Sequence, residues 1–230
     1  MKTFDYLKSI SLVATAMTMT ACGGGGGGGG TDTTDIPDPL PPASFSLAKI
    51  YSAKPSGLVY ETQLKGSSTD GATYTGSLSR TNQPKEMLSG VLVTPSEVIV
   101  TLTTSGITQT FATTTFIDSD DIHISSRDSD GVTCTPASPE KPPILVNIGD
   151  TGVFPITTCS DGTSNESSWE VTDAGDGTIY HIVTGVQKGG GAIKTKSVQT
   201  VNVDAGGSIV SYKTVTESLS SGNILTIESL

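Results

Sequence analysis

The chain of 230 residues predicts a mainly β fold, in which an antiparallel meander of strands forms a sandwich, a barrel or a half-barrel. Thr, Ser, Gly and Val are abundant, whereas stretches of Ala, Leu, Glu and Lys with helical spacing are scarce. Thr and Val suit a pleated sheet better than a helix, because their branched side chains are stiff at χ1. Short turn motifs separate the apolar stretches, which favours hairpins over alternating βα units.

Strands in the first half are predicted from strict alternation. In residues 58–65, Leu58, Tyr60 and Leu64 fall on one face, and the charged side chains fall on the other. A proline cannot donate to a ladder, so we expect Pro95 to end the strand before it. Ser105-Gly106 predicts the turn of a hairpin. The expected strands of this half are residues 58–65, 73–79, 87–94, 97–104 and 107–117.

The second half repeats this style, with turns rich in Gly and Asp between alternating segments. Gly189 to Gly191 break the chain, and Asp204-Ala-Gly-Gly207 predicts another hairpin turn. The expected strands here are residues 169–171, 179–186, 193–203, 208–217 and 224–228. Together the two halves predict a single β-rich domain over residues 43–230.

Two cysteines of the domain, Cys134 and Cys159, predict a disulfide if the chain is exported to an oxidising compartment. The segment between them contains four prolines, so we expect a disulfide-closed, irregular segment near residues 132–164. A metal site on these two cysteines is the alternative, which the lack of neighbouring histidines disfavours.

The first 42 residues have the composition of a targeting signal followed by a flexible spacer. Lys2 and Lys8 precede an uncharged, apolar segment of about a dozen residues, which is shorter than the roughly 20 needed to span a bilayer. Residues 1–21 therefore predict a signal peptide. Residues 22–42 hold eight consecutive glycines followed by a proline-rich stretch, which predicts a disordered tether.

Met19-Thr20-Ala21-Cys22 resembles the lipobox of bacterial lipoproteins, with Met in place of the usual Leu. The resemblance covers the first 22 residues. It implies cleavage before Cys22 and attachment of lipid to that cysteine. In a Gram-negative organism, Gly23 after the cysteine further implies the outer membrane of the cell envelope. The expected partner is therefore a membrane, reached through the lipid anchor on Cys22.

The charge of the chain disfavours nucleic acid as a partner, because the formal net charge is −10 and no basic cluster is present. No cofactor motif is found, and the glycine run lacks the Lys-Ser/Thr of a phosphate-binding loop. A calcium site at Asp118, Asp120, Asp121, Asp128 and Asp130 is a minor alternative to ordinary turn chemistry. No metal ligand is therefore assigned from the residue types.

Catalytic residues are not assigned either. His123 and His181 are the only histidines, both in predicted strands, and no Gly-x-Ser-x-Gly motif accompanies them. Trp169 and the tyrosines are expected to pack in the core. The favoured function is a noncatalytic structural or binding module. A carrier that encloses an apolar ligand, with Val98, Val100 and Leu102 facing it, is the first alternative, and a hydrolase is the second.

Overall fold

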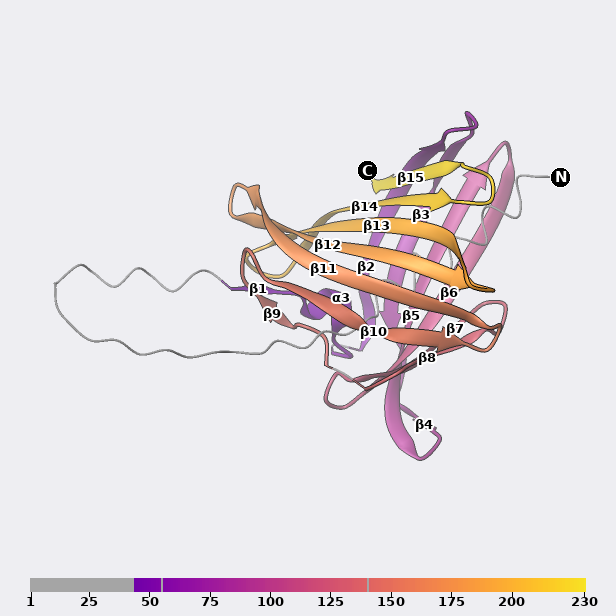
Figure 1. Ribbon diagram of the computed structural model, residues 1–230. Coiled ribbons are helices and arrows are strands. Elements are labelled where there is room, and N and C mark those ends of the chain that lie inside the picture. The colour runs from indigo at the N-terminus through magenta and orange to yellow at the C-terminus, as the bar shows by residue number, and fades with distance from the viewer. Residues whose placement is uncertain (1–43, 55, 140) are drawn as a thin grey trace, which may run out of the picture.

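Tight turns connect almost every pair of neighbouring strands, and the result is one continuous antiparallel sheet (Figure 1). The computed structural model describes residues 44–54, 56–139 and 141–230. The predicted signal peptide, the tether and Cys22 lie outside the described residues. The prediction of a mainly β fold is confirmed, because nearly all described elements are strands.

The elements follow one another in this order: β1 (Phe45–Ser46), α3 (Ala48–Tyr51), β2 (Gly57–Ser68), β3 (Thr73–Asn82), β4 (Glu86–Leu88), β5 (Val91–Thr104), β6 (Ile107–Asp118), β7 (His123–Asp128), β8 (Thr133–Pro136), β9 (Leu145–Val146), β10 (Thr151–Cys159), β11 (Thr163–Gly175), β12 (Thr178–Gly189), β13 (Ala192–Asp204), β14 (Ile209–Ser218) and β15 (Ile224–Ser229). β1 and β9 pair with each other in a small separate sheet. The remaining strands form the large sheet.

The large sheet closes into an up-and-down barrel. Each strand of the ring pairs with its neighbours in the chain, from β2 through β3, β5, β6, β7, β8, β10 and onward to β15. β15 then pairs with β2, from Leu225 opposite Ser68 to Ser229 opposite Leu64, which completes the ring. The strand β4 pairs only with the start of β5, as a hairpin that projects from the ring (Figure 1).

The predicted hairpins are confirmed, and their turns have the expected backbone. Ser105 and Gly106 between β5 and β6 have φ of 48° and 76°. Gly190 and Gly191 between β12 and β13 have φ of 60° and 79°. Two consecutive residues with positive φ match the right-handed twist of the flanking strands, and glycine adopts this conformation without strain.

The expectation that Pro95 ends a strand is wrong, because β5 runs through it and pairs it with Phe116 of β6. Pro95 stands where β5 changes partners on its other edge, between the residues that pair with β4 and those that pair with β3. Its carbonyl accepts a hydrogen bond from the Gln83 amide at 2.7 Å on that edge. The missing N–H therefore also faces that edge, and it does not interrupt the ladder with β6.

The segment of residues 132–164 is more regular than expected, because it contains β8, β9 and β10. β8 and β10 pair directly, with Thr158 opposite Thr135. Prolines are accommodated at the end of β8, where Pro136 lies, and at a register shift between Phe154 and Thr157 of β10. Only the stretch between β8 and β10 keeps the irregular character predicted from its composition, interrupted there by the short β9.

Side chains alternate between the two faces of the barrel wall. Charged residues gather on the outer face, where Lys65 and Glu228 form an ion pair at 3.3 Å across the closing strands. Lys188 and Glu166 form another at 2.6 Å across β12 and β11. Both pairs are half-exposed. Within the described ranges, no helix is long and apolar enough to cross a membrane.

Candidate functional site in the barrel interior

The inner face of the barrel carries both apolar and polar side chains on most of its strands, and we name one group of each the apolar wall and the polar wall. The apolar wall lies on β15, β2, β3 and β5, which are neighbours around the ring. Its side chains are almost fully buried and belong to the hydrophobic core: Leu64, Leu78, Val98, Val100, Leu102, Leu225 and Ile227. Three of them, Val98, Val100 and Leu102, are the residues expected to face inward, and they do so.

The polar wall lies on β6, β10, β11 and β13 and is built from uncharged hydroxyl and amide side chains. We define it by six residues, each no more than 3 % exposed: Thr113, Thr115, Thr157, Asn165, Thr195 and Gln199. Alternation along β13 places Thr195 and Gln199 on the face that carries the core residue Val201. Thr157 lies directly opposite Asn165 in the ladder between β10 and β11.

Polar atoms of this wall lack hydrogen-bond partners among the described residues. They include both amide atoms of Gln199, the Asn165 carbonyl oxygen Oδ1 and the hydroxyls of the four threonines. Asn165 Nδ2 has only a weak contact, with Cys159 Sγ at 3.6 Å. Buried polar groups in folded proteins are nearly always hydrogen-bonded. Unpartnered buried atoms also occur outside the polar wall among the described residues, for example at Tyr74 of β3 and Trp169 of β11.

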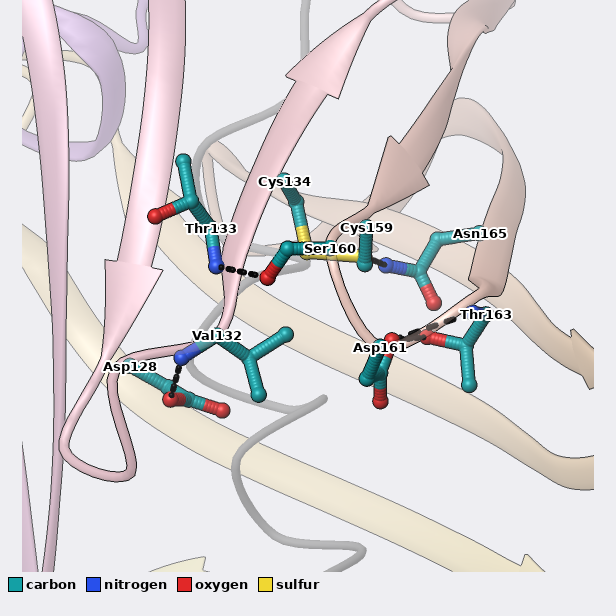
Figure 2. Close-up of a disulfide and its surroundings, with 9 residues drawn as sticks. All are labelled: Asp128, Val132, Thr133, Cys134, Cys159, Ser160, Asp161, Thr163 and Asn165. Carbon is teal, nitrogen blue, oxygen red and sulfur yellow. Dashed lines mark hydrogen bonds between the residues drawn. A yellow bond between two sulfur atoms is a disulfide. The ribbon is translucent and has the colours of Figure 1, made fainter.

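A disulfide lies within the polar wall and links its two parts (Figure 2). Cys134 of β8 and Cys159 of β10 are directly opposite each other, with 3.9 Å between their Cα atoms. The ladders continue from Cys134 to Ser126 of β7 and from Ser126 to Thr115 of β6. The predicted Cys134–Cys159 disulfide is confirmed. It links the neighbouring strands β8 and β10, where β8 is only four residues long.

The segment of residues 45–52, which we call the plug, contains β1 and α3 and packs against the inner face of the barrel. Leu47, Ile50 and Tyr51 of the plug are buried. Tyr51 contacts Phe154 of β10 and His181 of β12, whereas the backbone of Lys49 contacts β3. Since these strands lie far apart around the ring, the plug occupies its interior.

Arg80 of β3 fixes the plug to the barrel. Its side chain is 2 % exposed and donates to three oxygens: Ser96 Oγ at 2.8 Å, the Lys49 carbonyl at 2.6 Å and the Ser52 carbonyl at 2.9 Å. Burial lowers the pKa of Arg80 to about 10, an effect that nearby Asp121 opposes. Sequence reasoning missed this residue, although the alternation of Tyr74, Gly76 and Leu78 along β3 continues inward to Arg80.

His181 belongs to the plug contacts and not to a catalytic arrangement with a serine. Its Nε2 atom is 3.4 Å from the Tyr51 hydroxyl, and its ring lies 6.0 Å from that of Trp169. Burial lowers the pKa of His181 to about 4 and raises the pKa of Tyr51. His123 of β7 is also buried, and desolvation lowers its pKa to about 4. The structure does not bring the two histidines together.

Two of the acidic residues considered as calcium ligands, Asp118 and Asp128, form hydrogen bonds with backbone amides of their own turns. Asp118 accepts hydrogen bonds from the amides of Asp120 and Ile122, at 2.8 Å and 2.9 Å. Asp128 does the same for Asp130 and Val132 (Figure 2 draws the second bond). In the part of the chain that the structure describes, no group of three or more His, Cys, Asp or Glu side chains could hold a metal ion.

Asp121 faces the plug instead of the solvent, as its 9 % exposure indicates. Its Oδ1 atom accepts hydrogen bonds from the Ser52 hydroxyl and from the Ala53 amide, both at 2.9 Å. Arg80 of β3 and Asp121 of the turn between β6 and β7 therefore both hold the C-terminal end of the plug.

Compared with known protein families, characterised proteins and solved structures, the chain matches none.

Proposed function

We propose that this chain is an exported lipoprotein, held on the outer membrane through lipid on Cys22, and that its barrel is a noncatalytic binding module. The observation that carries the proposal is the contrast between the two faces of the barrel. The outer face carries charged side chains, and the inner face, apart from the buried Arg80, carries mainly uncharged groups, some of them without partners among the described residues. This contrast favours a barrel that stands in water and recognises something inside.

The outer face supports attachment through the anchor and not through the strands. Barrels that span a membrane present an apolar band to lipid, and a lysine at its middle costs about 2–4 kcal/mol. Here Lys65, Lys196 and Lys213 project outward along the strands. Lipid on Cys22, followed by a glycine-rich tether, would hold such a barrel clear of the bilayer.

The disulfide supports the exported location. Disulfides persist in oxidising compartments such as the periplasm and the cell surface, and they are rare in the cytosol. The bond between Cys134 and Cys159 joins two strands of the binding module itself. Export and the lipid anchor are therefore consistent with the chemistry of the domain.

A carrier of an apolar ligand is the second candidate, and the apolar wall favours it. Val98, Val100 and Leu102 face inward together with Leu225 and Ile227. A ligand that lies against this wall would gain from burial of its own apolar surface. The hydrolase alternative has no comparable support, because His181 bonds with Tyr51.

Metabolic labelling with an alkyne analogue of palmitate tests the anchor. We expect the wild-type protein to take up the label and to fractionate with outer membranes, whereas Cys22→Ala takes up none and is released from the membrane fraction. The double variant Cys134→Ala/Cys159→Ala is the matched control, because it removes cysteines of the same chain and should keep the label. Equal labelling of wild type and Cys22→Ala would overturn the anchor.

A further inference from the structure

An open cleft lies on the outer face of the barrel, at the base of the β4–β5 hairpin that projects from the ring (Figure 1). Its floor lies on β5, β6 and β7, and its wall is formed by residues 83–86, which lead from β3 into β4. The volume of the cleft is about 530 Å³, which lies within the range of small-molecule sites. The cleft therefore has room for a ligand outside the packed interior.

Two rows of side chains form the floor of the cleft. Glu97 of β5 lies directly opposite Thr114 of β6, and Thr114 lies directly opposite Arg127 of β7. Pro95 and Phe116 form the adjoining row, two positions along the strands, and both are buried. Alternation places all of these side chains on the face opposite to the core residues of β5. The floor thus combines an apolar row with a row that carries a charge at each end.

Arg127 is held at one end of the charged row by the aromatic ring beside it. Its guanidinium carbon lies 5.6 Å from the centre of the Phe116 ring, and a cation is attracted to the face of such a ring. In the part of the chain that the structure describes, the guanidinium forms no hydrogen bond or ion pair. Its N–H groups can therefore bind a carboxylate through two parallel hydrogen bonds.

Glu97 lies at the other end of the charged row. Its carboxylate accepts one long hydrogen bond, from Gln83 Nε2 at 3.4 Å, and it forms no ion pair within the described ranges. Its remaining acceptor sites can take the N–H donors of an ammonium group. Lys85 and Glu86 of the wall add one charge of each sign, so the cleft favours neither a polyanion nor a polycation.

The distance between the two ends of the row sets the length of a matching ligand. Two strand spacings of about 4.8 Å place the backbones of Glu97 and Arg127 roughly 10 Å apart. An extended peptide advances about 3.3 Å per residue, so three residues span the same distance. The amino group of such a peptide would meet Glu97 and its carboxylate would meet Arg127. The Thr114 hydroxyl, between them, can bond with a peptide group.

We propose that this cleft binds a short peptide of about three residues with free termini, with Arg127 on its carboxylate and Glu97 on its ammonium group. The site lies on the outer face, so this inference goes beyond the interior recognition proposed above and does not depend on the lipid anchor. Specificity arises because a peptide that is capped at either end leaves one charge of the cleft without its partner.

Isothermal titration calorimetry of the purified full chain, with trialanine as the probe, tests the proposal. We expect saturable binding of trialanine. Trialanine acetylated at its N-terminus, or amidated at its C-terminus, should bind about tenfold more weakly, because each loses one charge-assisted contact. Arg127→Met and Glu97→Gln should each weaken binding of uncapped trialanine by about tenfold as well. Lys213→Met and Glu217→Gln are the matched controls: they remove one charge of each sign on β14, away from the cleft, and should leave binding unchanged.

The same two variants test the orientation of the peptide. In Arg127→Met, amidation of the C-terminus should have no further effect, whereas acetylation of the N-terminus should still weaken binding. Glu97→Gln should show the reverse pattern. Such cycles isolate the contact between one residue and one terminus from a general change in the shape of the cleft. Arg127 is exposed and Glu97 is half-buried, so both variants are expected to fold, and the emission of Trp169 checks this.

Four results would each overturn the proposal. Trialanine does not bind the wild-type chain; both capped peptides bind as tightly as trialanine; neither variant weakens binding; or each variant remains equally sensitive to both caps. The labelling of Cys22 is measured in cells, whereas peptide binding is measured with purified protein. Loss of the anchor would therefore leave the binding result intact, and failure to bind the peptide would leave the anchor intact.

Discussion

His181 is a neutral side chain at the pH of most cellular compartments, because burial places its folded-state pKa at about 4. In the unfolded chain a histidine titrates near 6.5. Above about pH 7.5 neither state is protonated, and the histidine does not affect the free energy of unfolding. As the pH falls from about 6.5 to about 4, the unfolded chain gains a proton that the folded chain excludes, so stability is lost across that window.

We predict that His181→Phe reduces this acid sensitivity. Each pKa unit corresponds to about 1.4 kcal/mol, so His181 accounts for up to about 3 kcal/mol of stability lost between pH 7.5 and pH 4. Urea unfolding at both pH values measures the difference, with Tyr180→Phe on the outer face of β12 as the control. An unchanged pH dependence in His181→Phe would show that the ring is protonated in the folded state.

Single residues also show what a sequence can reveal. Alternation along β12 predicts which face of the sheet His181 lies on, and its burial follows because that face is the inner one. Its partner was not predictable, because Tyr51 lies 130 positions earlier in the chain, in a segment with no strand pattern. The same holds for Arg80, whose type suggests the surface and whose three oxygen partners come from β5 and from the plug.

At the scale of elements, the plug depends on the barrel around it, and β3 supplies one of its main contacts. Its four-residue helix α3 is far too short to be stable alone, since isolated helices need roughly 12–15 residues. Its backbone carbonyls at Lys49 and Ser52 are satisfied by Arg80. The plug therefore keeps its place because β3 supplies a buried cation to oxygens that the helix cannot satisfy itself.

We predict that Arg80→Met destabilises the protein by about 3 kcal/mol, because it leaves the Lys49 carbonyl and the Ser96 hydroxyl without this donor. It also removes the shorter of two hydrogen bonds to the Ser52 carbonyl, which keeps only Asn82 Nδ2 at 3.3 Å. Methionine keeps the length of the stem, so the loss reflects the guanidinium. Arg127→Met is the matched control: Arg127 is exposed and lies 5.6 Å from the centre of the Phe116 ring, a contact worth under about 1 kcal/mol. Urea unfolding compares them, and equal losses would contradict the role given to Arg80.

The hairpins were the predictable elements, and the reason is local. Turn residues such as Ser105-Gly106 specify a backbone conformation that brings the adjacent strands together, regardless of the rest of the fold. Pro95 was misjudged because its effect depends on which edge of β5 has a partner at that point. That information belongs to the neighbours of β5, and the local sequence does not contain it.

At the scale of the whole molecule, the barrel is completed by the pairing of β15 with β2. This ladder has five residue pairs, fewer than the ladders that join consecutive long strands. Gly66 pairs with Ile227 there, and a Cβ atom at Gly66 would lie 2.5 Å from the Thr226 carbonyl oxygen. The closing strands thus approach at a position that has no room for a side chain.

We predict that Gly66→Ala destabilises the protein by about 1–3 kcal/mol, as overpacking does elsewhere, because the backbone of β15 must shift. Amide hydrogen exchange should be faster at Thr226 and Ile227 in this variant than in wild type. Ser67→Ala changes the next residue, which is exposed, and should affect neither stability nor exchange. Protection at β15 equal to wild type in Gly66→Ala would show that the closing strands tolerate the methyl group.

Ring closure was not predictable from the sequence, and neither was the choice of a barrel over a sandwich. Both architectures use the same alternation and the same turns. They differ in whether the first and last strands meet, and Leu225 and Ser68 are separated by most of the domain. The polar wall was equally hidden, since a buried threonine and an exposed threonine have the same sequence signature until the strands are placed around a ring.

The meeting of β2 and β15 has a consequence for the time at which the protein becomes functional. A chain that crosses a membrane from its N-terminus delivers β2 early and β15 last. Until residues 224–229 emerge, the edge of β2 that faces β15 has no strand to pair with, and the ring stays open. Contacts between such distant parts of a chain form slowly. If the chain is exported as proposed, nearly the whole sequence must be delivered before the interior exists, and a chain cut short by a few residues at its C-terminus would lose its closing strand.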